Sequence, residues 1–219
     1  MQSPRSHEEL PQTVPVFPLS GALLLPNTHR PLNIFEPRYV ALVDRALATD
    51  RLVGLVQPLD TRVESPRGHV PLQSVGCLGR ITHFEEQDDE RYFIILEGVS
   101  RFDILDEIET PDPFRICRVS AARFARDFDH EYGSTEVDRK RFLAMMHSYA
   151  DFAQLDIDWS EVERTDTADL VNFCCVVSPY GAAEKQALLE AMTLNERAET
   201  LIAMAEIEMA RSRPGSTLQ

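Results

Sequence analysis

Arg30-Pro31-Leu32-Asn33-Ile34-Phe35-Glu36-Pro37-Arg38-Tyr39 is the segment that decides the fold, because it predicts a strand that turns directly into a helix. Leu32 and Ile34 are apolar residues of an extended run. Pro37 is unsuited to the middle of a strand but suits the first helical position, where its missing N–H is not needed. We therefore expect Glu36 to cap the helix, with its carboxylate near the free amides of the first turn.

The helix predicted after this corner has one apolar face. Its apolar side chains recur at helical spacing and are Tyr39, Leu42, Val43, Ala46 and Leu47. Asp44 and Arg45 point away from this face. The helix must therefore lie against the sheet to which the preceding strand belongs.

Other short strands are predicted on both sides of this unit. Extended apolar or alternating runs cover residues 14–19, 52–56, 75–84, 92–96, 101–108 and 114–119. Pro15 and Pro18 break the first run, which favours a position at the edge of a sheet. Residues 59–72 are predicted to form an exposed loop. The acidic run 85–90 suits a hairpin connection better than a cation site, since EF-hand spacing is absent. Many short strands with tight connections indicate a small barrel or rolled sheet.

Beyond residue 125 the apolar residues adopt helical spacing. Residues 135–138 have capping-box spacing before a first helix, and 193–196 have it before a last one. A helix from residue 165 or 166 places Leu170, Phe173, Cys174 and Val177 on one face, and another covers 183–191. Met145 and Met146, with Phe142, suit either an adaptable binding surface or the bundle core. The predicted fold class is α+β, with a disordered tail at 1–12, a barrel domain at 13–125, a helical bundle at 134–211 and a second tail at 212–219.

The composition favours a soluble globular protein without nucleic acid or membrane partners. The chain has 219 residues and a net charge of −14, which repels phosphate backbones. No apolar run is long enough to span a bilayer, and the N-terminus lacks the apolar core of a signal peptide, so we expect a cytoplasmic protein.

Motifs for catalysis, metal binding and cofactor binding are missing from the sequence. The four cysteines form no C-x-x-C pair, and the six histidines have no H-E-x-x-H spacing. There is no G-x-S-x-G elbow and no phosphate-binding P-loop. The sequence therefore predicts no catalytic residue, no metal and no cofactor.

Four segments in order resemble a known family. They are residues 16–19 with 24–26, residues 31–39, residues 76–81 and residues 97–102. Together they are similar to the N-terminal substrate-recognition domain of the ATP-dependent Lon protease. In the helical half, residues 170–172 and 184–190 resemble the same family, so that the likeness covers about 13–210 of the sequence.

The resemblance implies a PUA-like β-barrel followed by a helical bundle. In full-length Lon this domain precedes an AAA+ ATPase and a Ser/Lys-dyad peptidase, and the motifs of neither are found in this sequence. Only two lysines occur, Lys140 and Lys185, both on predicted helices. The resemblance thus implies a stand-alone Lon-domain protein that recognises substrates and is not an enzyme.

Two functions from different classes follow. The first is recognition of unfolded or extended protein segments through apolar docking, with a separate ATP-dependent protease as a further partner. The candidate peptide-binding residues are Phe17, Leu24, Leu25, Phe35, Arg38 and Tyr39. The structural alternative for Glu36 and Arg38 is a cap and an ion pair that hold the corner. The second function is RNA binding through Arg62, Arg67 and Arg80, which the net charge disfavours.

Overall fold

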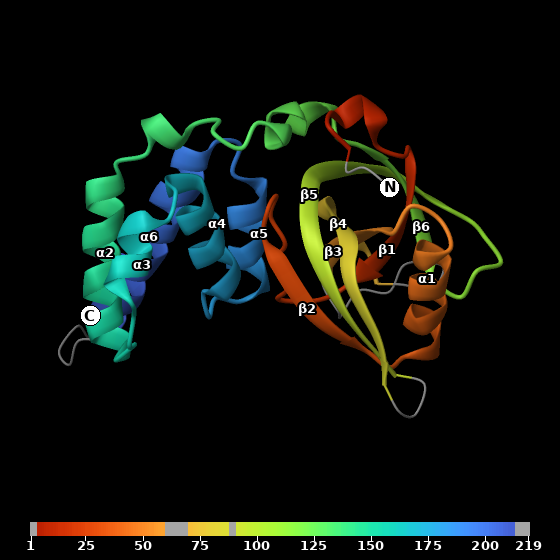
Figure 1. Cartoon of the computed structure of the whole chain (residues 1–219), viewed down its shortest axis with the longest axis horizontal. Coiled ribbons are helices and arrows are strands. Elements are labelled where there is room, and N and C mark those ends of the chain that lie inside the picture. Colours follow the sequence, from red (N-terminus) through yellow and green to blue (C-terminus); the bar gives the residue numbers. More distant parts are fainter. Residues whose placement is uncertain (1–3, 60–69, 88–90, 213–219) are drawn as a thin grey trace, which may run out of the picture.

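The chain folds into two lobes, a rolled sheet and a helical bundle (Figure 1). The computed structural model describes residues 4–59, 70–87 and 91–212. In chain order the elements are η1 (His7–Glu9), β1 (Thr13–Pro18), β2 (His29–Ile34), α1 (Pro37–Leu47), β3 (Leu52–Pro58), β4 (Leu72–Gln87), β5 (Arg91–Ile108), β6 (Arg115–Ser120), η2 (Ala122–Phe128), η3 (Ser134–Glu136), α2 (Arg139–Ala153), α3 (Trp159–Arg164), α4 (Thr167–Val177), α5 (Ala182–Glu190) and α6 (Leu194–Arg211). The α+β fold class is therefore confirmed.

The six strands form one sheet that rolls up through its longest strand. The strand order is β2-β5-β4-β3-β1-β6, and β6 also pairs with β5. The first part of β5 pairs with β2 and its last part pairs with β6. β5 thus pairs with both β2 and β6 along the same side. The sheet therefore closes on itself without being a regular barrel.

The corner between β2 and α1 has the predicted form but a different electrostatic arrangement. Glu36 occupies the N-cap position with extended backbone, and Pro37 is the first helical residue. The Glu36 carboxylate makes no capping hydrogen bond. It accepts instead from Arg38, whose Nη2 lies 2.7 Å from Glu36 Oε2. The predicted ion pair is present, and the predicted contact with the helix amides is wrong.

β1 is not an edge strand, which corrects the expectation drawn from its prolines. It lies between β3 and β6 in the sheet. Residues 13–16 pair with β6, whereas residues 16–18 pair with β3. Each half of β1 has one paired side. Pro15 and Pro18 are tolerated because each lies where the strand is paired on only one side, so the nitrogen without a hydrogen can face the unpaired side.

The bundle differs from the predicted one at its first helices. The N-cap of α2 is Asp138, which accepts a hydrogen bond from the Arg141 N–H, so the capping box expected at 135–138 is wrong. α3 was not predicted. The capping box of α6 is confirmed, because Thr193 and Glu196 satisfy each other's backbone amides.

α5 joins the bundle to the sheet through buried polar side chains. Gln57 of β3 donates to the carbonyl of Ala182 and to the side chain of Gln186. Gln186 in turn donates to the carbonyl of Val75 in β4. Apolar side chains of the sheet and the bundle also belong to one continuous core. The proposed boundary between 125 and 134 falls within the segment that carries η2 and the start of η3.

Several predictions concern residues outside the described ranges. They include most of the loop 59–72 with Arg62 and Arg67, the end of the acidic run 85–90, the first residues of the N-terminal tail and most of the C-terminal tail. Among the described helices, none has the length and the apolar character needed to cross a membrane.

Candidate functional site

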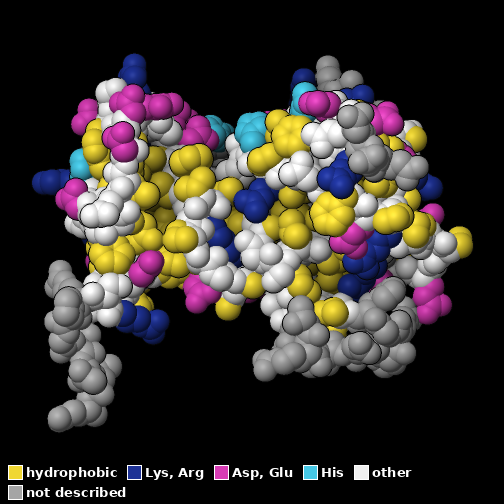
Figure 2. Space-filling model, turned by 90° about the horizontal axis from the view of Figure 1, so that it is seen from below, with side chains coloured by type: hydrophobic (Ala, Val, Ile, Leu, Met, Phe, Trp, Pro, Cys, Tyr) yellow, Lys and Arg dark blue, Asp and Glu magenta, His cyan; other side chains and the backbone are white. Residues whose placement is uncertain are grey.

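The largest cavity described is a groove in the helical bundle. It has a volume of about 760 Å³ and is bordered by α2, the segment 155–158, α3, α4, the segment 178–180 and residues 27–29 of the sheet lobe. We call it the bundle groove. Its apolar wall includes Met145, Met146, Tyr149, Leu155, Phe173 and Val177. Figure 2 shows hydrophobic side chains gathered on the bundle lobe as seen from below.

α4 supplies the central wall because most of its residues from Leu170 onward are apolar. Its buried side includes Val171, which is 0% exposed, and Cys175, which is also 0% exposed. Phe173 and Val177 are 59% and 57% exposed. The face predicted from spacing, with Leu170, Phe173, Cys174 and Val177, lines the bundle groove. A helix of this kind has a second apolar face that the described bundle does not cover.

Methionine side chains line the groove opposite α4. Phe142 and Met145 are 0% and 9% exposed and belong to the core, whereas Met146 is half-buried against it; both methionines border the cavity. The core alternative therefore holds for Phe142 and Met145, and Met146 is the member that suits an adaptable surface. Flexible thioether side chains adapt to apolar ligands of varied shape.

The end of α4 rests on a buried lysine. Lys185 Nζ donates to the carbonyls of Cys175 and Val176, at 2.7 and 2.8 Å, and to Ser178 Oγ at 3.0 Å. Burial lowers the pKa of Lys185 to about 8. Ser178 Oγ donates its own hydrogen to the carbonyl of Cys175. All three ammonium hydrogens are therefore engaged, and the pair acts as a C-terminal cap of α4. A Ser/Lys nucleophile would need a free amine instead.

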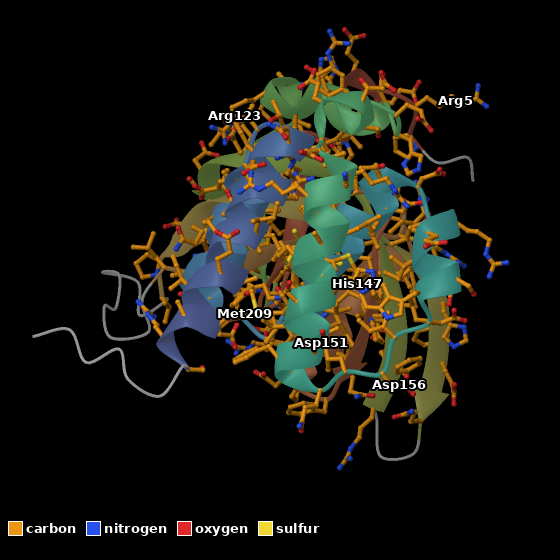
Figure 3. All side chains as sticks on the ribbon, turned by 90° about the vertical axis from the view of Figure 1, so that its left-hand side faces the viewer. Arg5, Arg123, His147, Asp151, Asp156 and Met209 are labelled. Carbon is orange, nitrogen blue, oxygen red and sulfur yellow. The ribbon has the colours of Figure 1, made fainter. Side chains whose placement is uncertain are left out.

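The outer wall of the groove, α3, is fixed by two contacts. Arg139 of α2 donates to the carbonyls of Val162, Glu163 and Thr165 at the end of α3. At the start of α3, the Trp159 ring stacks on His147 of α2 with centroids 3.5 Å apart. Figure 3 labels His147 among the side chains between α2 and α3. α3 has no buried residue of its own, so these contacts position the wall.

Carboxylates surround the apolar wall. Asp156, Asp158, Glu161 and Asp169 all border the groove. Asp158 caps α3 by accepting from the Ser160 and Glu161 amides. The hydrogen bond from the Ser160 hydroxyl is the main cause that lowers the pKa of Asp158. This carboxylate therefore stays ionised well below neutral pH.

One cluster of side chains near the groove has the atoms of a cation site. His130, Asp166 and Asp169 each offer one ligand atom, and these atoms lie within 4.8 Å of one another. His130 Nδ1 also lies 2.9 Å from Asn27 Nδ2. His130 and Asp166 are exposed, and such exposed groups are common on proteins without a metal. We assign no ion to them.

The six residues predicted to bind peptides do not form one surface. Phe17, Leu24, Leu25 and Tyr39 are 7%, 1%, 0% and 8% exposed and belong to the core. An exposed apolar edge at residues 16–26 is therefore corrected to a buried one. Phe35 is 66% exposed beside the Glu36–Arg38 pair. In Figure 1 this corner, at the start of α1, lies on the side of the sheet lobe away from the bundle.

The bundle groove was missed because the sequence shows which face is apolar but not which face is covered. The signal available was α4 itself. Residues 170–177 contain seven apolar residues out of eight, more than one buried face requires.

Comparisons with known proteins agree on one family. Residues 13–206 match the model described as "ATP-dependent protease La (LON) substrate-binding domain". Lon protease of Parabacteroides distasonis is 27% identical over 197 residues, which is 89% of this chain and 24% of that protein. Lon protease of Desulfosudis oleivorans is 34% identical over 107 residues, which is 49% of this chain and 13% of that protein.

Solved structures share the fold. A Lon N-terminal domain protein from Xanthomonas campestris superposes with a TM-score of 0.62 at 22% identity, covering 87% of this chain and 97% of that one. The N-terminal domain of Mycobacterium avium complex Lon protease gives a TM-score of 0.63 at 20% identity, covering 89% and 98%. The chain spans about a quarter or less of the curated proteins it matches. With a family match over most of its length, this chain belongs to the LON substrate-binding domain family.

Proposed function

We propose that the protein recognises exposed apolar segments of other proteins and binds them in the bundle groove. The observation that carries this proposal is the uncovered apolar face of α4, where Phe173 and Val177 stand 59% and 57% exposed over the cavity. Membership of a substrate-binding family supports a protein ligand. The relatives named Lon protease also suggest a separate ATP-dependent protease as a further partner.

The dimensions of the groove suit a few apolar side chains. Its volume of about 760 Å³ lies within the roughly 300–1,000 Å³ that is usual for ligand sites. Apolar side chains of a segment would pack against Phe173, Val177 and the two methionines. Because binding must also order a flexible segment, we expect micromolar or weaker affinity, about −8 kcal/mol or less favourable.

Titration of the protein with fluorescently labelled unfolded peptides tests the proposal. Phe173→Asp places a charge in the apolar wall, and we expect it to weaken binding at least tenfold. Phe35→Asp is the matched control, because Phe35 is exposed to a similar extent, 66%, on the other lobe. Both residues lie at the surface, so neither change should unfold the protein. Absence of binding by the parent protein would reject the proposal.

The same pair of variants tests the surface predicted from the sequence. If Phe35→Asp rather than Phe173→Asp abolishes binding, the segment binds at the corner formed by Phe35 and Arg38. We favour the bundle groove because the corner offers one exposed aromatic ring and a closed ion pair, whereas the groove offers a hollow lined by several apolar side chains.

RNA binding is not favoured. Arg80 donates through Nη1 to the carbonyl of Asp50, which fixes its guanidinium against the sheet lobe. Four carboxylates border the bundle groove, and they would repel phosphate groups.

A further inference from the structure

The structure assigns a charge preference to the bundle groove: we propose that it selects apolar segments flanked by lysine or arginine over apolar segments with neutral or acidic flanks. This inference rests on the proposed function. It is carried by the charges around the groove, where Asp156, Asp158, Glu161 and Asp169 meet no Lys or Arg among the described lining residues.

The carboxylates are placed to meet a ligand that lies on the apolar wall. Asp156 and Asp158 belong to the segment between α2 and α3, and Glu161 belongs to α3. Asp169 belongs to α4. Figure 3 shows Asp156 near the end of α2, and Figure 2 shows acidic side chains along the border of the bundle lobe. A segment bound in the groove would therefore have acidic groups beside its apolar part.

Three of these carboxylates are exposed and have no cationic partner within the described part of the chain. The ion pairs of the described residues include none for Asp156, Asp158 or Glu161. Asp169 lies 3.5 Å from the His130 ring, in the cluster that also contains Asp166. Since their negative charges are not neutralised within the described chain, they remain available to cations on a ligand.

The basic residues near the groove do not neutralise these carboxylates. The guanidinium of Arg139 donates hydrogen bonds to carbonyls at the end of α3 and to the Thr167 hydroxyl. Lys185 is buried behind α4 and donates to its last carbonyls. Arg164 donates from Nε to the Ser160 carbonyl on α3 and does not line the cavity. His29 is the only basic side chain among the described lining residues.

The expected preference is modest, because the charges are exposed to water. Each exposed pair contributes a few-fold in affinity at most, so three pairs give about tenfold. Screening reaches about 8 Å at physiological ionic strength and about 3 Å at 1 M, so added salt should remove the preference while leaving apolar binding.

Three labelled peptides with one shared apolar core test the inference. Their flanks are two lysines, two serines or two glutamates on each side, and binding is measured by fluorescence anisotropy at low and high salt. We expect the lysine-flanked peptide to bind about tenfold more tightly than the serine-flanked one at low salt, and the glutamate-flanked one to bind most weakly. At high salt the three affinities should converge.

A charge-matched pair of double variants locates the effect. Asp156→Asn with Glu161→Gln should reduce the ratio of affinities for the lysine-flanked over the serine-flanked peptide from about tenfold to a few-fold. Glu86→Gln with Glu206→Gln removes the same charge from exposed positions outside the groove and should preserve the preference. Loss of the preference in this control instead would overturn the inference.

The two proposals fail in distinguishable ways. Equal affinity for all three peptides at low salt would overturn the charge preference and leave apolar recognition intact. Binding of none of the peptides would overturn the proposed function together with the inference.

Discussion

Lys185 stabilises the end of α4, the helix that forms the central wall of the groove. It is 3% exposed, and its ammonium group satisfies the last carbonyls of α4 directly behind Val177. Replacing it by methionine keeps the length of the side chain but leaves the carbonyls of Cys175 and Val176 without a charged donor. We expect Lys185→Met to lower the unfolding free energy by about 2–3 kcal/mol at neutral pH. Urea denaturation measures this, and an unchanged midpoint and slope would contradict the role of the cap.

The same residue predicts a pH dependence of stability. Burial lowers the pKa of Lys185 from 10.5 to about 8. Between these pH values the unfolded chain holds a proton that the folded chain has released, so the contribution of this lysine to stability rises as the pH rises through this window. Below pH 8 the cost of the buried charge is fully present. Methionine has no such term, so the stability of the parent relative to Lys185→Met should grow from pH 8 to pH 10.5, by up to about 3 kcal/mol.

Comparing the two proteins removes the effects of other groups from this measurement. Burial raises the pKa of the thiols of Cys77, Cys117, Cys174 and Cys175. These thiols destabilise the fold in alkali, because the unfolded chain then releases protons first. The thiols of Cys77, Cys117 and Cys174 are present in both proteins and cancel in the difference, whereas the pKa of Cys175 also depends on the charge of Lys185. Parallel pH profiles for the parent and Lys185→Met would contradict the expected titration.

Gly98 predicts a second residue-scale effect, in the sheet. A Cβ atom at this position would overlap the carbonyl oxygen of Leu25. Two backbone hydrogen bonds hold the strands together at this point, from Asn27 N to Gly98 O and from Gly98 N to Thr28 O. We expect Gly98→Ala to cost about 1–3 kcal/mol, because the backbone has to move. Gly21→Ala tests space separately from backbone conformation, since nothing lies within 4 Å of its position but its φ is +70°.

At the scale of elements, α3 depends on α2 for its position. Arg139 satisfies three carbonyls at the end of α3, and α3 buries no residue of its own. Arg139→Gln should therefore loosen α3 while the other helices stay folded, and peptide affinity should fall several-fold. Hydrogen exchange of the α3 amides measures the loosening, and Arg141→Gln, which removes an exposed pair with Glu199, is the control. Equal protection of α3 in all three proteins would contradict this dependence.

Elements also show how far the sequence could predict the structure. The corner at Glu36–Pro37 and the capping box at Thr193 were predictable, because local chemistry specifies both. α3 was not, because it has six residues, no buried face and contacts supplied from α2. The position of β1 was not predictable either, since two short pairings share one strand.

The candidate site could be predicted from the sequence only in part. Spacing alone grouped Leu170, Phe173, Cys174 and Val177 on one face of α4, and this face lines the groove. Whether a face is covered depends on how α2 and α3 are placed, which spacing does not encode. Leu24 and Leu25 were wrongly predicted in the opposite sense. Because they lie beside turns in the sequence, we expected them to be exposed, but they fill the core.

At the scale of the whole molecule, buried polar groups tie the two lobes together. Arg101 of β5 pairs with Asp127, with Nη2 and Oδ1 2.7 Å apart and side chains 5% and 7% exposed. It also donates through Nη1 to the carbonyls of Leu189 and Ala191 at the end of α5. The guanidinium therefore connects the sheet, the segment that follows it and the bundle. A continuous apolar core runs through the same region.

This arrangement predicts that the two lobes unfold together. Trp159, the single tryptophan, reports on the bundle by fluorescence, and the NMR signals of the amides in β3, β4 and β5 report on the sheet. The two midpoints in urea should coincide in the parent protein, since one core spans both lobes. Arg101→Met leaves Asp127 buried without its partner, which should cost about 3–5 kcal/mol and separate the two midpoints. Adding Asp127→Asn to Arg101→Met removes the unpaired charge and should restore part of the loss. If the two midpoints already differ in the parent protein, the lobes are independent domains, and the buried arginine does not couple them.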